Sequence, residues 1–349
     1  MSQLAIRVAV NGYGAIGKRV ADAVLAQEDM TLVGVADVAS DWRPGVAVDK
    51  GIDLFLAGDG RRASHSPDTF FSAGTLRDLL AEVDIVVDCT PKGVGARNAD
   101  LYGEEGVKFV VQGGESHEVT GHSFVADANY ASAIGRDSTR VVSCNTTSIV
   151  RTLTALKRAG LLGRARGTLL RRATDPWESH LGGIMNTVVP EPAIPSHQGP
   201  DARTVDPDLD LVTVAAKVPE TLAHVHFWSV DLPRAADREN ALAAFGASSR
   251  IASVRIDAGL GAVNAVKEMA LDQGRSRGDI HEVVLWEDLV TVVGRELHYA
   301  YMVDNQAIVV PETIDAIRAL TSREPAAEGS IDRTNQALGI IGGPWSPRA

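Results

Sequence analysis

The first half of the chain alternates short, β-branched apolar runs with stretches whose apolar residues recur every three or four positions. Residues 5–10, AIRVAV, predict a buried strand, and the KRVADAVLAQ that follows soon after predicts an amphipathic helix. Similar apolar runs at 31–37, 83–91 and 107–115 each end in small or polar residues. Strands that alternate with helices predict a doubly wound parallel sheet of the α/β class.

A glycine-rich turn joins the first predicted strand to the first predicted helix. It has the pattern G-x-G-x-x-G, with Gly12, Gly14 and Gly17 as the glycines and Ala15 and Ile16 between the last two. The first glycine permits a tight turn, the second lets the backbone approach a pyrophosphate, and the third lets the helix pack closely on the strand. Because the motif follows a strand and opens a helix, it predicts a dinucleotide site.

The second predicted strand ends in Asp37, twenty residues after Gly17. A carboxylate in this place binds the ribose 2′-hydroxyl of NAD and would repel the 2′-phosphate of NADP. No basic residue follows it until Arg43. The sequence therefore predicts NAD in preference to NADP. The alternative is an ordinary βαβ turn with a solvated carboxylate at the strand end.

Cys144, one of only two cysteines, comes shortly after the apolar pair at 141–142 and stands next to Asn145. A helical pattern begins directly after it, so we expect the helix dipole to lower the pKa of the thiol. Strand ends of a doubly wound sheet line the ligand crevice, which predicts a nucleophilic thiol beside the nicotinamide. The other cysteine, Cys89, has no acid–base partner nearby in sequence and is predicted to be a small buried residue.

Polar groups that suit a thiol nucleophile gather in three stretches of the second half. They are Arg171 and Arg172 at the end of a predicted strand, His197 and Gln198 in a proline-rich loop, and His224 and His226 on one face of another strand. Taken singly, each has an ordinary explanation as a solvated group, and two histidines alone complete no metal site. Together with a nicotinamide site they indicate oxidation of a phosphorylated aldehyde through a thioester.

Composition narrows the class of protein further. A length of 349 residues predicts two domains, and a net charge of -11 without long runs of Lys or Arg argues against nucleic acid as a partner. Two cysteines exclude a disulfide scaffold and a four-cysteine zinc site, and we expect no metal. The start of the chain lacks the features of a signal peptide, and no apolar stretch approaches the roughly 20 residues needed to span a bilayer. These features predict a cytoplasmic protein that does not bind membranes.

Over nearly its whole length, the sequence resembles the archaeal-type (class II) phosphorylating glyceraldehyde-3-phosphate dehydrogenases. The motifs that carry the resemblance include NGYGAIGKRVADAV, VQGGE, VVSCNTTSIVRTL, RRATDP, PSHQGPD and LAHVH, of which SCNTT and PSHQGPD are specific. The resemblance implies a Rossmann-type NAD-binding domain over 1–143 and a catalytic α/β domain with a mainly antiparallel sheet over 144–302. Helices over 303–349 would return to the NAD-binding domain. It also implies a homotetramer that acts on glyceraldehyde 3-phosphate and inorganic phosphate.

The predicted site combines this resemblance with the residue patterns above. Cys144 matches the nucleophile, and the catalytic base corresponds to a histidine of LAHVH, for which we choose His224 over His226. The predicted substrate-binding residues are Ser143, Asn145, Thr146, Arg171, Arg172, His197 and Gln198. The predicted cofactor-binding residues are Gly12, Gly14, Ala15, Ile16, Gly17, Asp37, Thr90, Gly114, Arg172 and Asn305.

The chain departs from the family pattern in three of these positions. Gln198 stands where the family usually has His, and Asn305 stands where it has a cofactor-contacting Gln. Asp37 stands where many NADP-accepting relatives have Lys, which agrees with a preference for NAD. The alternatives left open are a dehydrogenase for another phosphorylated aldehyde, such as erythrose 4-phosphate, a semialdehyde or acyl-phosphate reductase, and a non-catalytic NAD-binding regulator.

Overall fold

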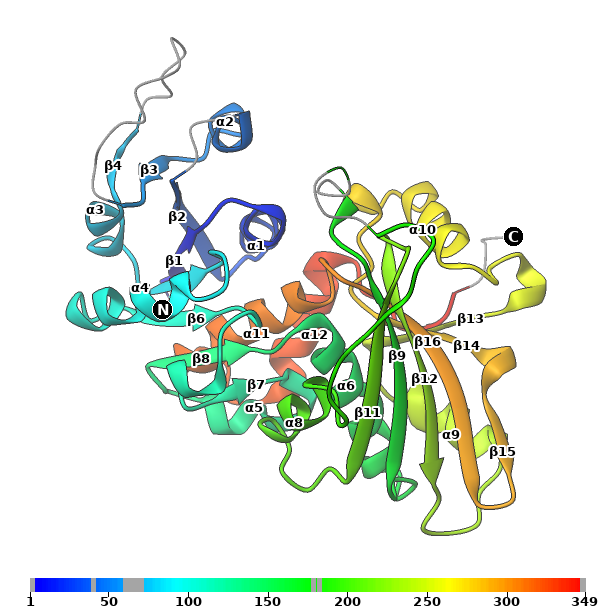
Figure 1. Cartoon of the computed structure of the whole chain (residues 1–349). Coiled ribbons are helices and arrows are strands. Elements are labelled where there is room, and N and C mark those ends of the chain that lie inside the picture. The colour runs from blue at the N-terminus through cyan, green and yellow to red at the C-terminus, as the bar shows by residue number, and fades with distance from the viewer. Residues whose placement is uncertain (1–3, 39–41, 59–71, 177–179, 181–183, 346–349) are drawn as a thin grey trace. The chain divides into compact units, whose positions relative to one another are not determined.

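A computed structural model of the chain describes residues 4–38, 42–58, 72–176, 180 and 184–345 (Figure 1). Its contacts divide the chain into two compact units. The first unit is Met1–Ser143 with Val309–Leu338, and the second is Cys144–Ile308 with Gly339–Ala349. Residues 303–308 and the stretch from Gly339 thus belong to the second unit. In the latter stretch, Gly343–Pro344 pair with a strand of that unit's sheet.

The first unit contains a parallel sheet with the strand order β4-β3-β2-β1-β5-β6-β8-β7 in the described residues. Its strands are β1 (Ile6–Asn11), β2 (Met30–Asp37), β3 (Leu54–Leu56), β4 (Gly74–Thr75), β5 (Ile85–Asp88), β6 (Lys108–Val111), β7 (Ser123–Phe124) and β8 (Ser138–Val141). The chain proceeds outward from β1 through β2, then returns to place β5 on the other side of β1. This reversal confirms the predicted doubly wound sheet and creates a ligand crevice where β1 and β5 end.

Helices pack on this sheet through their apolar faces. They are α1 (Ala15–Leu25), α2 (Trp42–Asp49), α3 (Leu76–Leu80), α4 (Val94–Glu104), α5 (Ala126–Ala133), α11 (Val309–Leu320) and α12 (Ala327–Leu338), with a 3-10 turn at His117–Val119. The late helix α11 is held in this unit by Arg318, whose buried guanidinium donates to both carboxylate oxygens of Asp29 at 2.8 Å and to Gln27 at 2.7 Å. A buried, bidentate ion pair of this kind costs several kcal/mol when one partner is removed.

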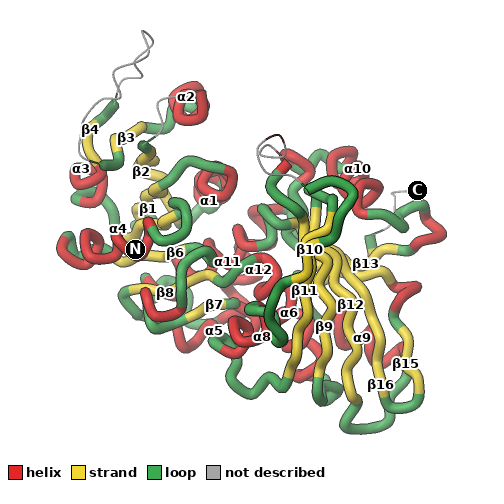
Figure 2. Tube along the Cα trace, viewed as in Figure 1, coloured by secondary structure: helices red, strands yellow, loops and turns green. Residues whose placement is uncertain are grey.

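The second unit contains a mixed sheet in which most neighbouring strands are antiparallel. Its strands are yellow in Figure 2. Its strands are β9 (Ala165–Arg172), β10 (Val189–Pro190), β11 (Leu211–Val218), β12 (Ala223–Asp231), β13 (Ile251–Val254), β14 (Val283–Trp286), β15 (Thr291–Val293), β16 (Glu296–Asp304) and β17 (Gly343–Pro344). Its helices are α6 (Cys144–Arg158), α8 (Gln198–Arg203), α9 (Arg238–Gly246) and α10 (Val263–Asp272), with 3-10 turns at Ile256–Ala258, Ser276–Gly278 and Glu287–Leu289. The predicted α/β fold with a second, mainly antiparallel sheet is confirmed.

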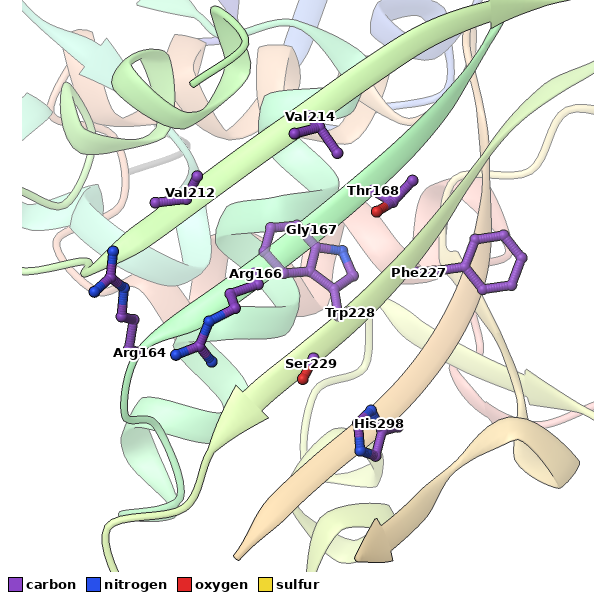
Figure 3. A pocket seen from close by; sticks show the side chains of 10 residues that line it. All are labelled: Arg164, Arg166, Gly167, Thr168, Val212, Val214, Phe227, Trp228, Ser229 and His298. Atoms are coloured by element: carbon purple, nitrogen blue, oxygen red, sulfur yellow. The ribbon is translucent and has the colours of Figure 1, made fainter. Parts of the chain in front are cut away.

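The two faces of this second sheet differ in what covers them. On β12, His224, His226 and Trp228 point to the face packed against α6 and α9, and all three are buried. Phe227 points to the opposite face and is 45% exposed. There the strands form a shallow hollow of about 430 Å³ (Figure 3). None of the helices in the described ranges is long and apolar enough to span a membrane.

Candidate active site

Cys144 is the first residue of α6, and its thiol meets a histidine of β12. The Sγ atom lies 3.3 Å from Nε2 of His224. The side-chain amide of Asn145 also points to the sulfur, with Nδ2 at 3.9 Å. Of the two histidines that the sequence left open, His224 is therefore the one in contact with the thiol. The fold places it there because His224 is on the covered face of β12, where it is buried against the first residue of α6.

The ring of His224 is oriented by the backbone of β9. The N–H of Arg172 donates to Nδ1 of His224 at 3.0 Å, so Nδ1 is the acceptor nitrogen. Burial, followed by electrostatic interactions with His226 and Arg172, holds the pKa of His224 well below its ordinary value, and the ring is neutral at physiological pH. A neutral imidazole has one N–H, which must then be on Nε2. His224 consequently meets the sulfur as a hydrogen-bond donor.

The predicted lowering of the Cys144 pKa is wrong. Although part of the residue reaches the surface, the sulfur is closely surrounded by protein atoms. Burial raises the pKa of the thiol to about 11, and the charges of Arg172 and Arg171 and the N–H of Asn145 reverse this only in part. The desolvation of a thiolate outweighs the helix dipole here. The thiol is protonated at neutral pH and must lose its proton before it can attack.

A carboxylate that sequence reasoning missed, Glu191, joins two of the predicted substrate residues. Arg171 donates from Nη1 to Oε2 at 2.8 Å, and His197 donates its backbone N–H to Oε1 at 3.0 Å, with its Nδ1 2.5 Å from the same oxygen. Burial would raise the pKa of Glu191, but the bonds from His197 and the charge of Arg171 lower it below its ordinary value. Nothing in the spacing of VVPEP indicates this role, because it depends on contacts that Glu191, which follows β10, makes with the end of β9 and with the residue before α8.

A second carboxylate, Asp175, connects two of the predicted cofactor residues. Its Oδ2 accepts from Nη2 of Arg172 at 3.2 Å, and its Oδ1 accepts from Nδ2 of Asn305 at 3.0 Å. Gln306 donates to the same Oδ1 at 2.9 Å. The end of β9 is thereby tied to the end of β16. In the sequence, this role of Asp175 is suggested only by its position, three residues after Arg172 and directly before a proline.

Other predicted substrate residues lie deeper or elsewhere. Thr146 is fully buried, and its hydroxyl donates to Asp201 at 2.6 Å, which links α6 to α8. Gln198, which was predicted to lie in a loop, is instead the first residue of α8 and is fully buried. Neither of its amide atoms has a hydrogen-bond partner in the part of the chain that the structure describes. The helix starts here because the hydroxyl of Thr213 accepts the N–H of Gly199 in its first turn. Ser143 precedes α6 and groups with the first unit.

The glycine turn of the first unit has the surroundings that a pyrophosphate site requires. Gly12 has φ +92°, and a Cβ there would approach the backbone of Cys89 to 2.8 Å. A Cβ on Gly17 would lie 1.8 Å from the carbonyl oxygen of Gly12, whereas a Cβ on Gly14 would have nothing within 4 Å. Gly12 and Gly17 thus allow close packing within the turn, whereas Gly14 leaves the N-terminus of α1 open. These residues fit a dinucleotide phosphate.

Asp37 lies beside this turn at the end of β2. Its Oδ2 accepts the backbone N–H of Tyr13 at 2.6 Å, which holds the carboxylate against the glycine loop. Ala15 and Ile16 form the first turn of α1. The predicted pyrophosphate and ribose contacts of the turn and of β2 are therefore gathered at one end of the sheet.

The ends of β5 and β6 supply the remaining predicted cofactor positions of this unit. Thr90 follows β5 and donates its backbone N–H and its hydroxyl to Oδ1 of Asp88, at 3.0 Å and 2.5 Å. Gly114 follows β6, where a Cβ would lie 3.5 Å from the side chain of Lys92. Both positions lie at carboxyl ends of parallel strands, where doubly wound sheets bind their ligands.

Comparison with known proteins identifies both units. A family described as "Dihydrodipicolinate reductase, N-terminus" matches residues 6–119, and one described as "Glyceraldehyde 3-phosphate dehydrogenase, C-terminal domain" matches residues 143–272. The glyceraldehyde-3-phosphate dehydrogenase of Methanobrevibacter smithii is 43% identical over 96% of this chain and 99% of its own length. That of Haloarcula marismortui is 44% identical over 96% of this chain and 94% of its own. That of Methanopyrus kandleri is 44% identical over 97% of this chain and 99% of its own. With identity at this level along nearly all of the sequence, the chain belongs to the archaeal-type glyceraldehyde-3-phosphate dehydrogenase family.

Proposed function

We propose that this protein catalyses the NAD-dependent oxidative phosphorylation of glyceraldehyde 3-phosphate to 1,3-bisphosphoglycerate. Its family supports a nicotinamide-dependent oxidation of a phosphorylated aldehyde, with inorganic phosphate as the second substrate. Within the chain, the observation that carries the proposal is the 3.3 Å contact between Sγ of Cys144 and Nε2 of His224 at the start of α6.

Cys144 is the nucleophile of the proposed mechanism. Once it has lost its proton to solvent, the sulfur attacks the aldehyde carbon, a C–S bond forms, and the carbonyl oxygen becomes the alkoxide of a hemithioacetal. The N–H groups of Asn145 and His224 that point to the sulfur are placed to stabilise both the thiolate and the adjacent oxygen. One well-placed donor of this kind is typically worth about 3 kcal/mol.

At the start of this reaction His224 has its proton on Nε2, because its Nδ1 accepts the backbone N–H of Arg172. We therefore assign it the role of a donor to the sulfur and then to the alkoxide. Collapse of the alkoxide to a thioester expels a hydride and needs no base, because the oxygen has no proton to lose. Bound NAD supplies the hydride acceptor. The alternative to this donor role is the one predicted from the sequence, in which His224 acts as a base.

The paired guanidinium groups serve the second half of the reaction. A phosphate oxygen attacks the thioester carbon, the C–S bond breaks, the acyl phosphate leaves, and the thiolate of Cys144 is restored. Arg171 and Arg172 suit the two phosphate groups because a planar guanidinium binds phosphate through two parallel hydrogen bonds. Glu191 and Asp175 hold the two arginines in place, at 2.8 Å and 3.2 Å.

The reaction is tested by following NADH formation with glyceraldehyde 3-phosphate, with and without phosphate or arsenate. We expect turnover that depends on either anion. Turnover that is independent of both would contradict the phosphorylating mechanism. Erythrose 4-phosphate and an amino-acid semialdehyde belong in the same series, because the buried amide of Gln198 stands where the family usually has an imidazole.

Asp37 supports the further proposal that NAD is preferred to NADP. Its carboxylate is held at the glycine turn by the N–H of Tyr13. A 2′-phosphate next to it would meet a like charge, which near a protein surface costs on the order of 1–4 kcal/mol.

We expect the Asp37→Asn variant to raise the ratio of kcat/KM for NADP to that for NAD by about tenfold or more. The amide keeps an oxygen for the N–H of Tyr13 and removes only the charge. Asp49→Asn, an exposed change at the end of α2, is the matched control and should leave the ratio unchanged. The role given to Asp37 is contradicted if the wild-type enzyme already prefers NADP or if the variant keeps its ratio.

A homotetramer in the cytoplasm is the assembly and location that we propose with this function. The uncovered face of the second unit's sheet supports association between copies, because Val212, Val214 and Phe227 face outward there and line the hollow in Figure 3. Contiguous apolar patches on a protein surface mark sites of association.

Phe227→Glu is expected to shift the solution mass from that of a tetramer to that of a dimer or monomer, because the charge cannot be buried against a second apolar face. Light scattering coupled to gel filtration measures the mass. Ala243→Glu, which adds the same charge on an exposed position of α9, should leave the tetramer intact. A monomeric wild-type protein, or a tetrameric Phe227 variant, would be the opposite result.

A further inference from the structure

We propose that Tyr301 and His226 form a one-way chain of hydrogen bonds that holds the Asn145 amide with its N–H toward the sulfur of Cys144. The proposal makes both of them positioning residues for the nucleophile. It rests on the proposed function only in taking Cys144 as that nucleophile. No part of the reaction described above uses His226 or Tyr301.

The chain of contacts is continuous from the sheet to the thiol. Nε1 of Trp228 donates to the hydroxyl of Tyr301 at 3.2 Å, and that hydroxyl lies 2.8 Å from Nδ1 of His226. Nε2 of His226 lies 2.8 Å from Oδ1 of Asn145, whose Nδ2 lies 3.9 Å from Sγ of Cys144. His226 and Tyr301 are directly opposite each other on β12 and β16, and both are 0% exposed. Water has no access to these two side chains to replace a missing partner.

The direction of the hydrogen bonds in this series follows from what each group can donate. The indole of Trp228 is only a donor, so the oxygen of Tyr301 accepts at that end. Burial raises the pKa of Tyr301, so its hydroxyl keeps its proton, and its shortest contact, at 2.8 Å, is to His226. A contact of 3.2 Å joins the hydroxyl to Oγ of Ser148, which gives its own proton to the backbone oxygen of Asn145 and could therefore only accept from Tyr301. We assign the single proton of Tyr301 to the shorter contact, so that Tyr301 donates to Nδ1 of His226.

The remaining two steps are then determined. Burial lowers the pKa of His226 to about 3, so the ring is neutral and has one N–H. With Nδ1 accepting from Tyr301, that N–H is on Nε2 and donates to Oδ1 of Asn145. The amide nitrogen is consequently turned to the sulfur. The opposite orientation would place Oδ1 against Cys144, where its negative partial charge would oppose formation of the thiolate.

Apart from His226, which also interacts electrostatically with His224, the charged and titratable groups around the sulfur lie outside this chain of hydrogen bonds. Those that act on it are His224, Arg172, Arg171 and Asp304, and none of them accepts from or donates to Tyr301 in the bonds of the described residues. Removal of the Tyr301 hydroxyl thus changes the orientation of the Asn145 amide without changing a charge at the site. This allows the positioning role to be measured by the reactivity of the thiol.

The experiment is the alkylation of Cys144 by iodoacetamide as a function of pH, without substrate or cofactor and in a Cys89→Ala background. Since the thiol has a pKa of about 11, the wild-type rate should rise about tenfold per pH unit between about pH 7 and 9. Tyr301→Phe and His226→Leu should each be about tenfold slower at every pH, as expected when a hydrogen bond to a charged group is lost. His226→Gln keeps a side-chain N–H that can reach Oδ1 and should remain within about threefold of wild type.

Tyr299→Phe is the matched control, because Tyr299 is a buried tyrosine of the same face of β16 that lies outside the chain of bonds. Its alkylation rate should equal that of the wild type. A wild-type rate in Tyr301→Phe, or equal slowing in His226→Gln and His226→Leu, would overturn the proposal. Tyr301→Phe removes a single oxygen and decides the matter if the leucine variant does not fold. Since alkylation needs no turnover, an inactive wild-type enzyme would contradict the proposed function and leave this test intact.

Discussion

Cys144→Ser is expected to lower dehydrogenase turnover by about 10⁴-fold or more, the scale on which removal of a catalytic nucleophile acts in other enzymes. A serine hydroxyl is far less acidic than a thiol, and an alkoxide leaves an ester less readily than a thiolate leaves a thioester. Both halves of the proposed reaction therefore slow. Turnover is measured as NADH formation with glyceraldehyde 3-phosphate and phosphate.

The same variant should bind NAD with nearly unchanged affinity, as measured by calorimetric titration. The glycine turn and Asp37 lie in the first unit, whereas Cys144 begins the second. Cys89→Ala provides the control, since it removes the other sulfur and is expected to leave turnover near that of the wild type. Turnover that survives in Cys144→Ser would refute the nucleophile, and a parallel loss of NAD binding would indicate a misfolded variant instead.

Two replacements of His224 should separate the role of a donor from the role of a base. His224→Leu removes both functions, and the rate of acyl-enzyme formation should fall by about 10²–10⁴-fold. His224→Gln retains an N–H that can reach the sulfur but cannot take up a proton at neutral pH. If His224 acts by donating the Nε2 proton that its bond with the Arg172 backbone implies, the rate of acyl-enzyme formation in the glutamine variant should fall only about tenfold.

Single-turnover formation of NADH measures this step without the contribution of phosphate. An equal loss in both variants would show that His224 acts as a base and that its proton moves from Nε2 before the reaction. The pH profile gives an independent reading. Since burial holds the pKa of His224 well below its ordinary value, the ring stays neutral and no limb of the profile near pH 6.5 should belong to it. Loss of such a limb in His224→Gln would contradict this.

Local sequence patterns were sufficient for the strands and turns of the first unit. The runs that end at Asn11, Asp37 and Asp88 are short and rich in β-branched residues, and each ends at a polar residue, so the strands could be predicted within one stretch of chain. The spacing of the glycines likewise predicts which of them pack closely within the turn, Gly12 and Gly17, and which faces the open side, Gly14. The alternation of His224 and His226 on a strand was also readable, because side chains on a strand repeat with a period of two.

The sequence did not indicate Glu191 or Tyr301, which set how the predicted site residues are held. Each acts on a side chain that comes from another strand or helix. Glu191 meets Arg171 across 20 positions, and Tyr301 meets His226 across 75. Such pairs exist only after the strands of the second sheet have aligned, so no local spacing records them.

What the sequence by itself determined was the order of strands, turns and helices, the family, and which side chains were available for the reaction. What only the tertiary structure decided was their protonation and their orientation. Cys144 shows the difference: the helix start that sequence reasoning identified is present, yet burial raises the pKa of its thiol to about 11. The dipole is a property of one helix, whereas desolvation depends on every element packed around the sulfur, and at this position the larger effect is the one that needs the whole fold.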